Sequence, residues 1–117
     1  MNDRFKFRAY GFNKMEYDIQ NDADFYFYFD INSDYIPMQC TGLKDKNGIL
    51  IYEGDIVKFG EEIYEAAYRT EWACFVIQPP TSSIEVQNIN SVETQTCFME
   101  VIGNIYENPE LLKGAKK

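Results

Sequence analysis

The sequence predicts a single, mainly β domain: a small SH3-like barrel with an N-terminal β-hairpin extension and a short C-terminal helical turn. The stretch from Gln39 to Phe59 combines an Asn-Gly turn signal with two apolar runs. The segment from Arg4 to Tyr10 alternates with period two, and Asn108-Pro109 precedes a short helical pattern near the end. We divide the 117 residues into N-terminal strands with an aromatic segment (1–38), a barrel-like core (39–112) and a basic tail (113–117).

The N-terminal segment is expected to form the first strand of a hairpin. Its alternation places apolar side chains on one face and the basic side chains Arg4, Lys6 and Arg8 on the other. A turn over residues 11–14 leads into a second strand at Met15–Tyr17. The basic face could bind a carboxylate or a phosphate, but charged side chains are also common on solvent-exposed strand faces, and we favour that plainer interpretation.

The run from Phe25 to Phe29 consists of five consecutive aromatic residues. Aromatic residues favour strands, so the run predicts a central strand with its phenylalanines inward and Tyr26 and Tyr28 half exposed. An interface between copies of the chain explains so many rings best, because tyrosine is enriched at interfaces. The alternative, a stacking platform for bases, is disfavoured because aspartates flank the run. Residues 31–38 are expected to be irregular, with Pro37 limiting strand pairing.

The central stretch predicts strand, tight turn and strand. Asn47-Gly48 marks a hairpin turn, after which the apolar run 49–52 is a strand. Asp55 opens the next strand, and we expect its side chain to accept hydrogen bonds from turn amides rather than to act in catalysis. Trp72 is expected in the core or at its rim. Further strands are predicted at 56–59, 63–68, 72–77, 84–87 and 98–106.

The last predicted strand leads into the helical turn. Gly103 allows a bulge or a close backbone approach within this strand. Asn108 is expected to cap the turn formed by Pro109, Glu110 and the two leucines that follow.

Composition and charge restrict the classes of partner. Eleven basic and 19 acidic residues give a net charge of −8, which disfavours nucleic acid and anionic membranes as partners. The sequence shows neither an apolar run of membrane-spanning length nor a signal-like N-terminus, so a cytoplasmic location is expected.

Cysteine and histidine usage restricts the chemistry. Cys40, Cys74 and Cys97 are widely spaced and odd in number, so we expect free thiols rather than a disulfide framework or zinc knuckle. The chain has no histidine, which excludes a Ser-His-Asp triad and a histidine-ligated metal. We predict no catalytic, cofactor-binding or metal-ligating residue, and no cofactor.

Three strings of residues resemble a known family. They are KFRAY at the start, TGLKDKNGILIYEGDIVKF in the centre and FMEVIGNIYENPELL at the end. In these strings the chain is similar to the YopX family of phage and prophage proteins, departing from it at Tyr10 (usually tryptophan) and at Ile49 and Leu50 (often Lys-Glu). The resemblance implies a β-rich, YopX-like and SH3-like barrel, encoded by a phage or prophage and present in a bacterial host. It carries no catalytic motif.

These observations favour a non-catalytic, self-associating interaction protein that binds an unknown host or phage protein through its acidic and aromatic surface. The alternative is an accessory protein of phage replication or expression that binds nucleic acid through its basic strand face. A metal-dependent hydrolase is the third and least favoured hypothesis, because no spaced carboxylate pair is recognisable. The candidate interaction residues are Arg4, Lys6, Arg8, Tyr26 and Tyr28.

Overall fold

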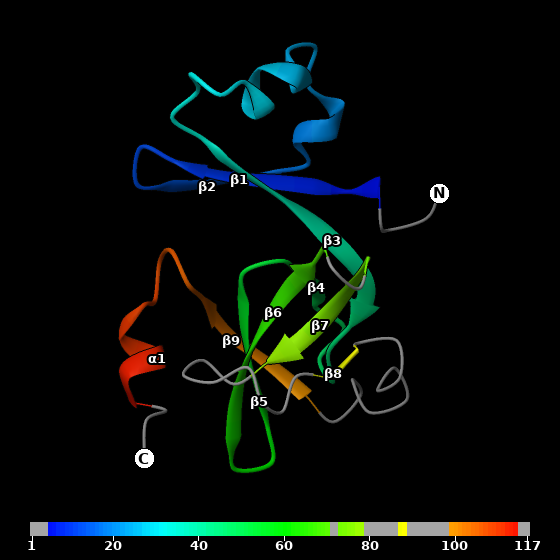
Figure 1. The fold of residues 1–117 in the computed structure, drawn as a ribbon, viewed down its shortest axis with the longest axis vertical. Coiled ribbons are helices and arrows are strands. Elements are labelled where there is room, and N and C mark those ends of the chain that lie inside the picture. The colour runs from blue at the N-terminus through cyan, green and yellow to red at the C-terminus, as the bar shows by residue number, and fades with distance from the viewer. Residues whose placement is uncertain (1–4, 71–72, 79–86, 89–98, 115–117) are drawn as a thin grey trace.

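The computed structural model describes residues 5–70, 73–78, 87–88 and 99–114 (Figure 1). Strands dominate this part of the chain, with two short 3₁₀ helices near the N-terminus and one short α-helix near the C-terminus. The elements are β1 (Phe7–Gly11), β2 (Lys14–Tyr17), η2 (Ile19–Asn21), η3 (Phe25–Phe29), β3 (Ile36–Lys44), β4 (Leu50–Tyr52), β5 (Asp55–Phe59), β6 (Glu62–Arg69), β7 (Cys74–Gln78), β8 (Gln87–Asn88), β9 (Met99–Asn104) and α1 (Glu110–Gly114). The mainly β prediction is confirmed.

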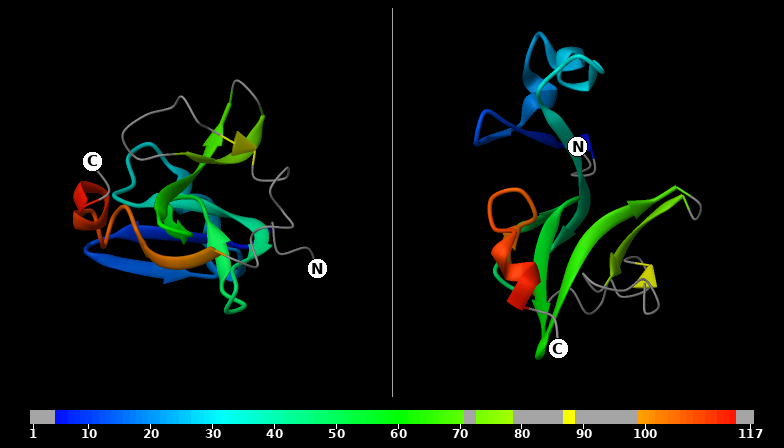
Figure 2. Two further views of the ribbon diagram at one scale, coloured as in Figure 1. Left: turned by 90° about the horizontal axis from the view of Figure 1, so that it is seen from below. Right: turned by 60° about the vertical axis from the view of Figure 1, so that its left-hand side comes forward.

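The strands form two antiparallel sheets. The first has the order β2-β1-β3-β4, and the second has the order β8-β7-β6-β5-β9. The second sheet curls into a half-barrel, as the turned view in Figure 2 shows. Strand β3 is long enough to run from one end of the molecule into the other (Figure 1). We call β1, β2, η2, η3 and the start of β3 (residues 7–38) the N-terminal lobe, and the rest the barrel lobe.

The predicted hairpins are confirmed. Strands β1 and β2 pair around a turn at Phe12 and Asn13, which both have positive φ. Gly48 has φ 80° in the turn between β3 and β4, which accounts for its place in the Asn-Gly pair. Gly54 has φ 87° between β4 and β5. The turn chemistry of the central stretch therefore predicted both turns correctly, although β4 and β5 belong to different sheets and do not pair.

The aromatic run is not a strand. Residues Phe25–Phe29 form the 3₁₀ helix η3, flanked by Asp24 and Asp30. The rings of Phe25 and Phe29 lie 5.1 Å apart between centroids, and both pack on Phe7 of β1 at 5.3 and 5.9 Å. An unbroken aromatic run has no periodicity, so nothing in its pattern distinguishes a strand from a helix.

The segment 31–38, expected to be irregular, is partly a strand. Strand β3 starts at Ile36, and Pro37 lies opposite Ala9 of β1. Proline is tolerated at the beginning of a strand, where few ladder hydrogen bonds are lost. The segment that leads into the central stretch is therefore paired, and it ties the N-terminal hairpin to the barrel lobe.

The core of the barrel lobe draws one residue from each of five strands. They are Ile51, Val57, Ala66, Ile77 and Met99, all buried. Their side chains point into the curled sheet, and some of their strand neighbours are buried as well, among them Tyr52, Ile56 and Val76.

Strand β9 contains the expected irregularity at Gly103. Val57 faces Val101 whereas Ile56 faces Gly103, so Ile102 is an extra residue and the strand bulges. A Cβ on Gly103 would lie 2.6 Å from Oδ1 of Asn108, so the close approach is also real. The Asn108 side chain turns back to this strand and accepts the Asn104 N–H at 3.2 Å, in place of the cap expected on α1.

Several predicted features lie outside the described residues. They are Arg4, Trp72 and the strand start there, most of the strand at 84–87, Phe98, and residues 115–117 of the basic tail. Among the described residues, the helices are all too short to cross a membrane.

Candidate functional site

Arg8 is buried, contrary to its predicted place on an exposed basic face. It is 2% exposed, and its Nη2 donates to Asp55 Oδ1 at 2.9 Å and to the Glu53 carbonyl at 3.0 Å. Its guanidinium carbon lies 4.7 Å from the Tyr52 ring centroid and 6.0 Å from that of Tyr17. The reason is topological: β1 lies between β2 and β3, and the face that carries Arg8 is turned toward the barrel lobe.

The basic strand face is therefore not present as predicted. Lys6 is half buried, Arg8 points inward, and Arg4 lies outside the described residues. Strand alternation identified which residues share a side of β1, but it could not reveal that both sides are covered.

Asp55 accepts a hydrogen bond from a turn amide, as predicted, and also forms an ion pair that the sequence analysis missed. Its Oδ2 accepts the Tyr52 N–H at 2.8 Å, which confirms the expected bond to a turn amide. Its Oδ1 pairs with Arg8, which lies 47 positions earlier in the chain. Burial raises the pKa of the Asp55 carboxyl, while the charge of Arg8 and the Tyr52 N–H oppose that rise. The pair thus pins the N-terminal lobe to the barrel lobe.

Asp45 connects the turn between β3 and β4 to strand β9. It is buried, and its Oδ1 accepts the N–H groups of Asn47 and Ile49 at 2.8 and 2.9 Å. Its Oδ2 accepts the Val101 N–H of β9 at 2.9 Å. Asp two residues before Asn is a local turn signal, but its reach to β9 is a tertiary contact.

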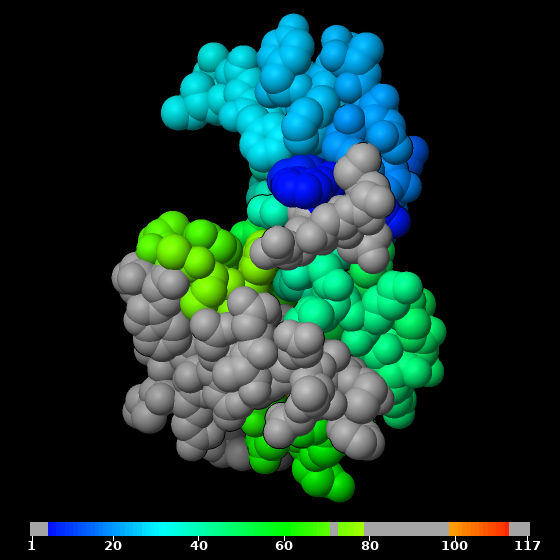
Figure 3. All heavy atoms as spheres, turned by 90° about the vertical axis from the view of Figure 1, so that its right-hand side faces the viewer, coloured from blue at the N-terminus to red at the C-terminus, as the bar shows by residue number. Residues whose placement is uncertain are grey.

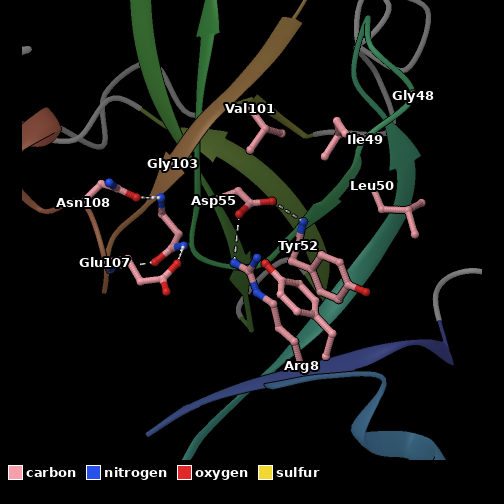
Figure 4. Close-up of a pocket in the computed structure, with 12 residues that line it drawn as sticks. Arg8, Gly48, Ile49, Leu50, Tyr52, Asp55, Val101, Gly103, Glu107 and Asn108 are labelled. Atoms are coloured by element: carbon pink, nitrogen blue, oxygen red, sulfur yellow. Dashed lines mark hydrogen bonds and ion pairs between the residues drawn. The ribbon is translucent and has the colours of Figure 1, made fainter. Parts of the chain in front are cut away.

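The turn after β9 is organised by Asn104. Its Oδ1 accepts the N–H groups of Tyr106 and Glu107 at 3.0 and 2.8 Å, and its Nδ2 donates to Glu107 Oε1 at 2.9 Å. These bonds hold the Glu107 and Asn108 side chains near the Arg8–Asp55 pair, as Figure 4 shows. The sequence analysis did not predict this network around Asn104, Glu107 and Asn108.

An open pocket of about 610 Å³ lies between these groups (Figure 4). Its volume falls within the range of about 300 to 1,000 Å³ typical of ligand sites. The lining residues are Arg8, Tyr17, Gly48, Ile49, Leu50, Tyr52, Asp55, Val101, Gly103, Asn104, Glu107 and Asn108. It combines apolar walls with a buried ion pair and an exposed carboxylate, Glu107.

A second feature is the surface of the N-terminal lobe around η3. Tyr26 is 76% exposed and Ile31 is 94% exposed, and about half of the side-chain surface of Phe27 and of Phe29 is also exposed. Figure 3 shows this part of the lobe, in light blue and cyan, at the outer end of the molecule. Tyr26 is thus exposed even more fully than predicted.

Tyr28 is held by local contacts. Its hydroxyl donates to Asp22 Oδ2 at 2.8 Å, and its ring packs edge-on against Tyr35 with centroids 4.9 Å apart. The bond to the carboxylate raises the pKa of Tyr28 to about 12. Tyr28 is half buried and does not continue the exposed surface of Tyr26.

The same surface is strongly acidic. Residues 15–43 contain six carboxylates and neither lysine nor arginine. Four of these side chains flank the exposed rings in the sequence and are exposed themselves: Asp22, Asp24, Asp30 and Asp34. We call Tyr26, Phe27, Phe29 and Ile31 with these four aspartates the acidic aromatic surface.

Within the described ranges, acidic and thiol side chains do not gather in threes as a metal site would require. Cys40 is buried and Cys74 is partly exposed, and these two described cysteines form no disulfide bond.

Comparison with known proteins identifies the family. The family model described as YopX protein matches residues 10–113. The chain belongs to the YopX family. A search of curated proteins found no match.

Two solved structures are similar to this chain. Protein EF1440 from Enterococcus faecalis is 34% identical over 91% of this chain and 74% of that chain, with a TM-score of 0.50. Protein yopX from Bacillus subtilis is 21% identical, covers 95% of this chain and 98% of its own, and has a TM-score of 0.59. This second likeness shows a shared fold.

The strings that carry the YopX resemblance meet at the pocket. Apart from Tyr17, every lining residue named above falls within residues 6–10, 41–59 or 98–112. The acidic aromatic surface lies outside these strings. The two candidate sites of this YopX protein are thus distinct in sequence as well as in structure.

Proposed function

We propose that this YopX protein is a non-catalytic interaction protein whose acidic aromatic surface binds a basic surface of a partner protein. The observation that carries the proposal is the joint exposure of Tyr26, Phe27 and Ile31 in a stretch without lysine or arginine. Large exposed apolar side chains beside polar ones are characteristic of interaction sites. The resemblance to phage and prophage proteins supports a partner in the cytoplasm of a bacterial host, encoded by the host or the phage.

Charge selects the partner. The aspartates of the surface attract lysine and arginine, and they repel phosphate and other acidic proteins. A second copy of this chain would bring the same carboxylates together, so a cationic partner is favoured over self-association through this surface. Self-association through another surface stays a prediction, to be measured by sedimentation equilibrium over a range of protein concentrations.

Nucleic-acid binding is less favoured by the structure than by the sequence. The basic strand face proposed to bind nucleic acid does not present Arg8, because Arg8 is buried and paired with Asp55. Phosphate contacts need exposed cations, and such binding is strongest at low salt.

The test is a pull-down with the tagged protein from lysate of a bacterial host, split into nuclease-treated and untreated halves, followed by binding measurements with the purified partner. The variant Y26A/F27A/I31S removes the exposed apolar groups, whereas Ile49→Glu alters the pocket and serves as the control. We expect the wild type and the control to retain a basic partner with similar affinity, and the triple variant to bind it at least ~10-fold more weakly, since interface aromatic residues are common hot spots.

Two results would overturn the proposal. One is a purified partner that binds the triple variant as tightly as the wild type. The other is retention that disappears with nuclease treatment, accompanied by binding of a DNA or RNA oligonucleotide at low salt, which would favour the nucleic-acid alternative.

A further inference from the structure

The acidic aromatic surface presents aromatic rings and negative charges together. Tyr26, Phe27 and Phe29 of η3 are each about half exposed or more. Exposed carboxylates stand directly before and after this helix, at Asp24 and Asp30. A partner must therefore cover aromatic rings and neutralise negative charges within one contact.

Two of the carboxylates are held in place by the fold. Asp22 Oδ2 accepts the Tyr28 hydroxyl at 2.8 Å, and Asp30 Oδ1 accepts the Asn32 N–H at 2.8 Å. Both aspartates are nevertheless exposed, so they present their charge from positions that the protein has already fixed. Groups that are ordered before binding lose less conformational freedom when a complex forms.

The combination of rings and charges distinguishes between kinds of basic surface. A surface that binds only phosphates would neutralise the aspartates but would leave the rings without apolar contacts. Grooves for single-stranded nucleic acid combine cations, which follow the phosphates, with aromatic side chains, on which the bases stack. Such a groove is complementary to this surface, because carboxylates can take the place of phosphates and the rings can take the place of bases.

We propose that the acidic aromatic surface occupies the single-stranded nucleic-acid groove of its partner and competes there with the nucleic acid. The aspartates contact lysine and arginine of the groove, and the rings of Tyr26 and Phe27 pack against its aromatic side chains. This inference rests on the proposed function and specifies the class of the basic partner. Competition takes place on the partner, because the net charge of −8 repels a free nucleic-acid strand from this protein.

The experiment is a displacement assay on the partner purified after the pull-down. The probe is a fluorescein-labelled oligo(dT) of about 20 nucleotides, which exceeds the ~4 to 16 nucleotides that one OB-fold groove covers. Fluorescence anisotropy measures the release of this strand from the partner as the YopX protein is added.

Two pairs of substitutions make a matched comparison. The variant D24N/D34N removes two exposed carboxylates of the acidic aromatic surface. The control E61Q/E62Q removes two exposed carboxylates at the turn between β5 and β6 in the barrel lobe. Both variants change the net charge by the same amount, so a difference between them reports where the charge lies.

We expect the wild type and E61Q/E62Q to release the labelled strand at similar concentrations. D24N/D34N and Y26A/F27A/I31S should each require a concentration at least ~10-fold higher, because each removes one of the two features that the groove recognises. In the pull-down, nuclease treatment should increase the amount of partner retained, because it empties the groove.

Polyphosphate separates charge from stacking, because it carries phosphates without bases. At equal phosphate concentration it should displace the YopX protein from the partner at least ~10-fold less effectively than oligo(dT).

The outcomes distinguish this inference from the proposed function. A partner that does not bind oligo(dT), that binds the strand and the YopX protein at the same time, or that responds equally to polyphosphate would overturn the inference alone. The acidic aromatic surface would still bind a basic partner in each of these cases. If D24N/D34N and Y26A/F27A/I31S both matched the wild type in binding and displacement, the inference and the proposed function would fail together.

Discussion

At the scale of single residues, Asp45 connects more of the fold than its place in a hairpin turn indicates. Its carboxylate holds the turn through Asn47 and Ile49 and also reaches Val101 on β9. Hydrogen bonds to a charged group contribute about 1.5 to 3 kcal/mol each, and the loss is largest where a donor is left buried. One side chain therefore links the turn between β3 and β4 to β9 of the other sheet.

Replacing Asp45 by Asn should destabilise the protein by about 2 kcal/mol, because the amide nitrogen would face an N–H donor where a carboxylate oxygen now accepts. The melting temperature should fall by about 8 °C. Thermal unfolding followed by circular dichroism measures this loss. Asp24→Asn is the control, because Asp24 is exposed and makes no capping hydrogen bond. Equal melting temperatures for the two variants would contradict the role assigned to Asp45.

The Arg8–Asp55 pair has a second consequence at the residue scale. Both side chains are 3% exposed, so removing either one leaves the other charge buried and unpaired. A variant that alters the pocket without this cost is Ile49→Glu, because Ile49 lines the pocket and is 52% exposed.

At the scale of elements, some aromatic residues of η3 pack against β1 and others are exposed to solvent. Phe25 and Phe29 pack on Phe7, whereas Tyr26 projects into solvent. A strand would have placed Tyr26 and Tyr28 on one common face; the 3₁₀ helix separates them, and Tyr28 bonds to Asp22.

This division predicts different effects of two neighbouring alanine substitutions. Phe25→Ala should lower the free energy of unfolding by about 2 kcal/mol, since it removes a partly buried ring from the cluster on β1. Tyr26→Ala should change it by less than about 0.5 kcal/mol. Urea unfolding measures both values. A larger cost at Tyr26 than at Phe25 would mean that the segment packs differently.

At the scale of the whole molecule, an acidic chain holds several carboxyls in partly buried positions. Burial raises the pKa of Glu53 and of Glu65 above the ordinary value of 4.5. Between the unfolded and the folded pKa the folded protein holds more protons, so stability falls as the pH rises through that window and then levels off. The net charge of −8 acts in the same direction through self-repulsion.

The protein should therefore be more stable at about pH 5 than at about pH 7. Glu65→Gln keeps the shape and polarity of the side chain but removes its titration, so it should reduce this difference. Glu62→Gln changes an exposed residue on the same strand and serves as the control for net charge. Urea unfolding at the two pH values measures the difference. A pH dependence unchanged by Glu65→Gln would show that other groups cause it.

Local signals account for what was predicted well. Asn47-Gly48, Gly54 and the alternation along β5 mark turns and strands through neighbouring residues alone, and the bulge at Gly103 follows from a glycine inside a strand pattern. The candidate sites were less predictable. Tyr26 was correctly placed on the surface, but Arg8 was not, because its burial depends on a partner far along the chain.

The sequence by itself determined the strand content, the positions of the central turns and the family, since these depend on residue type and spacing within short segments. Only the tertiary structure decided that β1 is covered on both sides, that the aromatic run is helical, and that a pocket lies between two sheet edges. These features depend on which distant segments meet: Arg8 with Asp55, Phe25 with Phe7, and Asp45 with Val101. Contacts between residues that lie far apart in the sequence leave no pattern within a short segment, so the sequence alone did not reveal them.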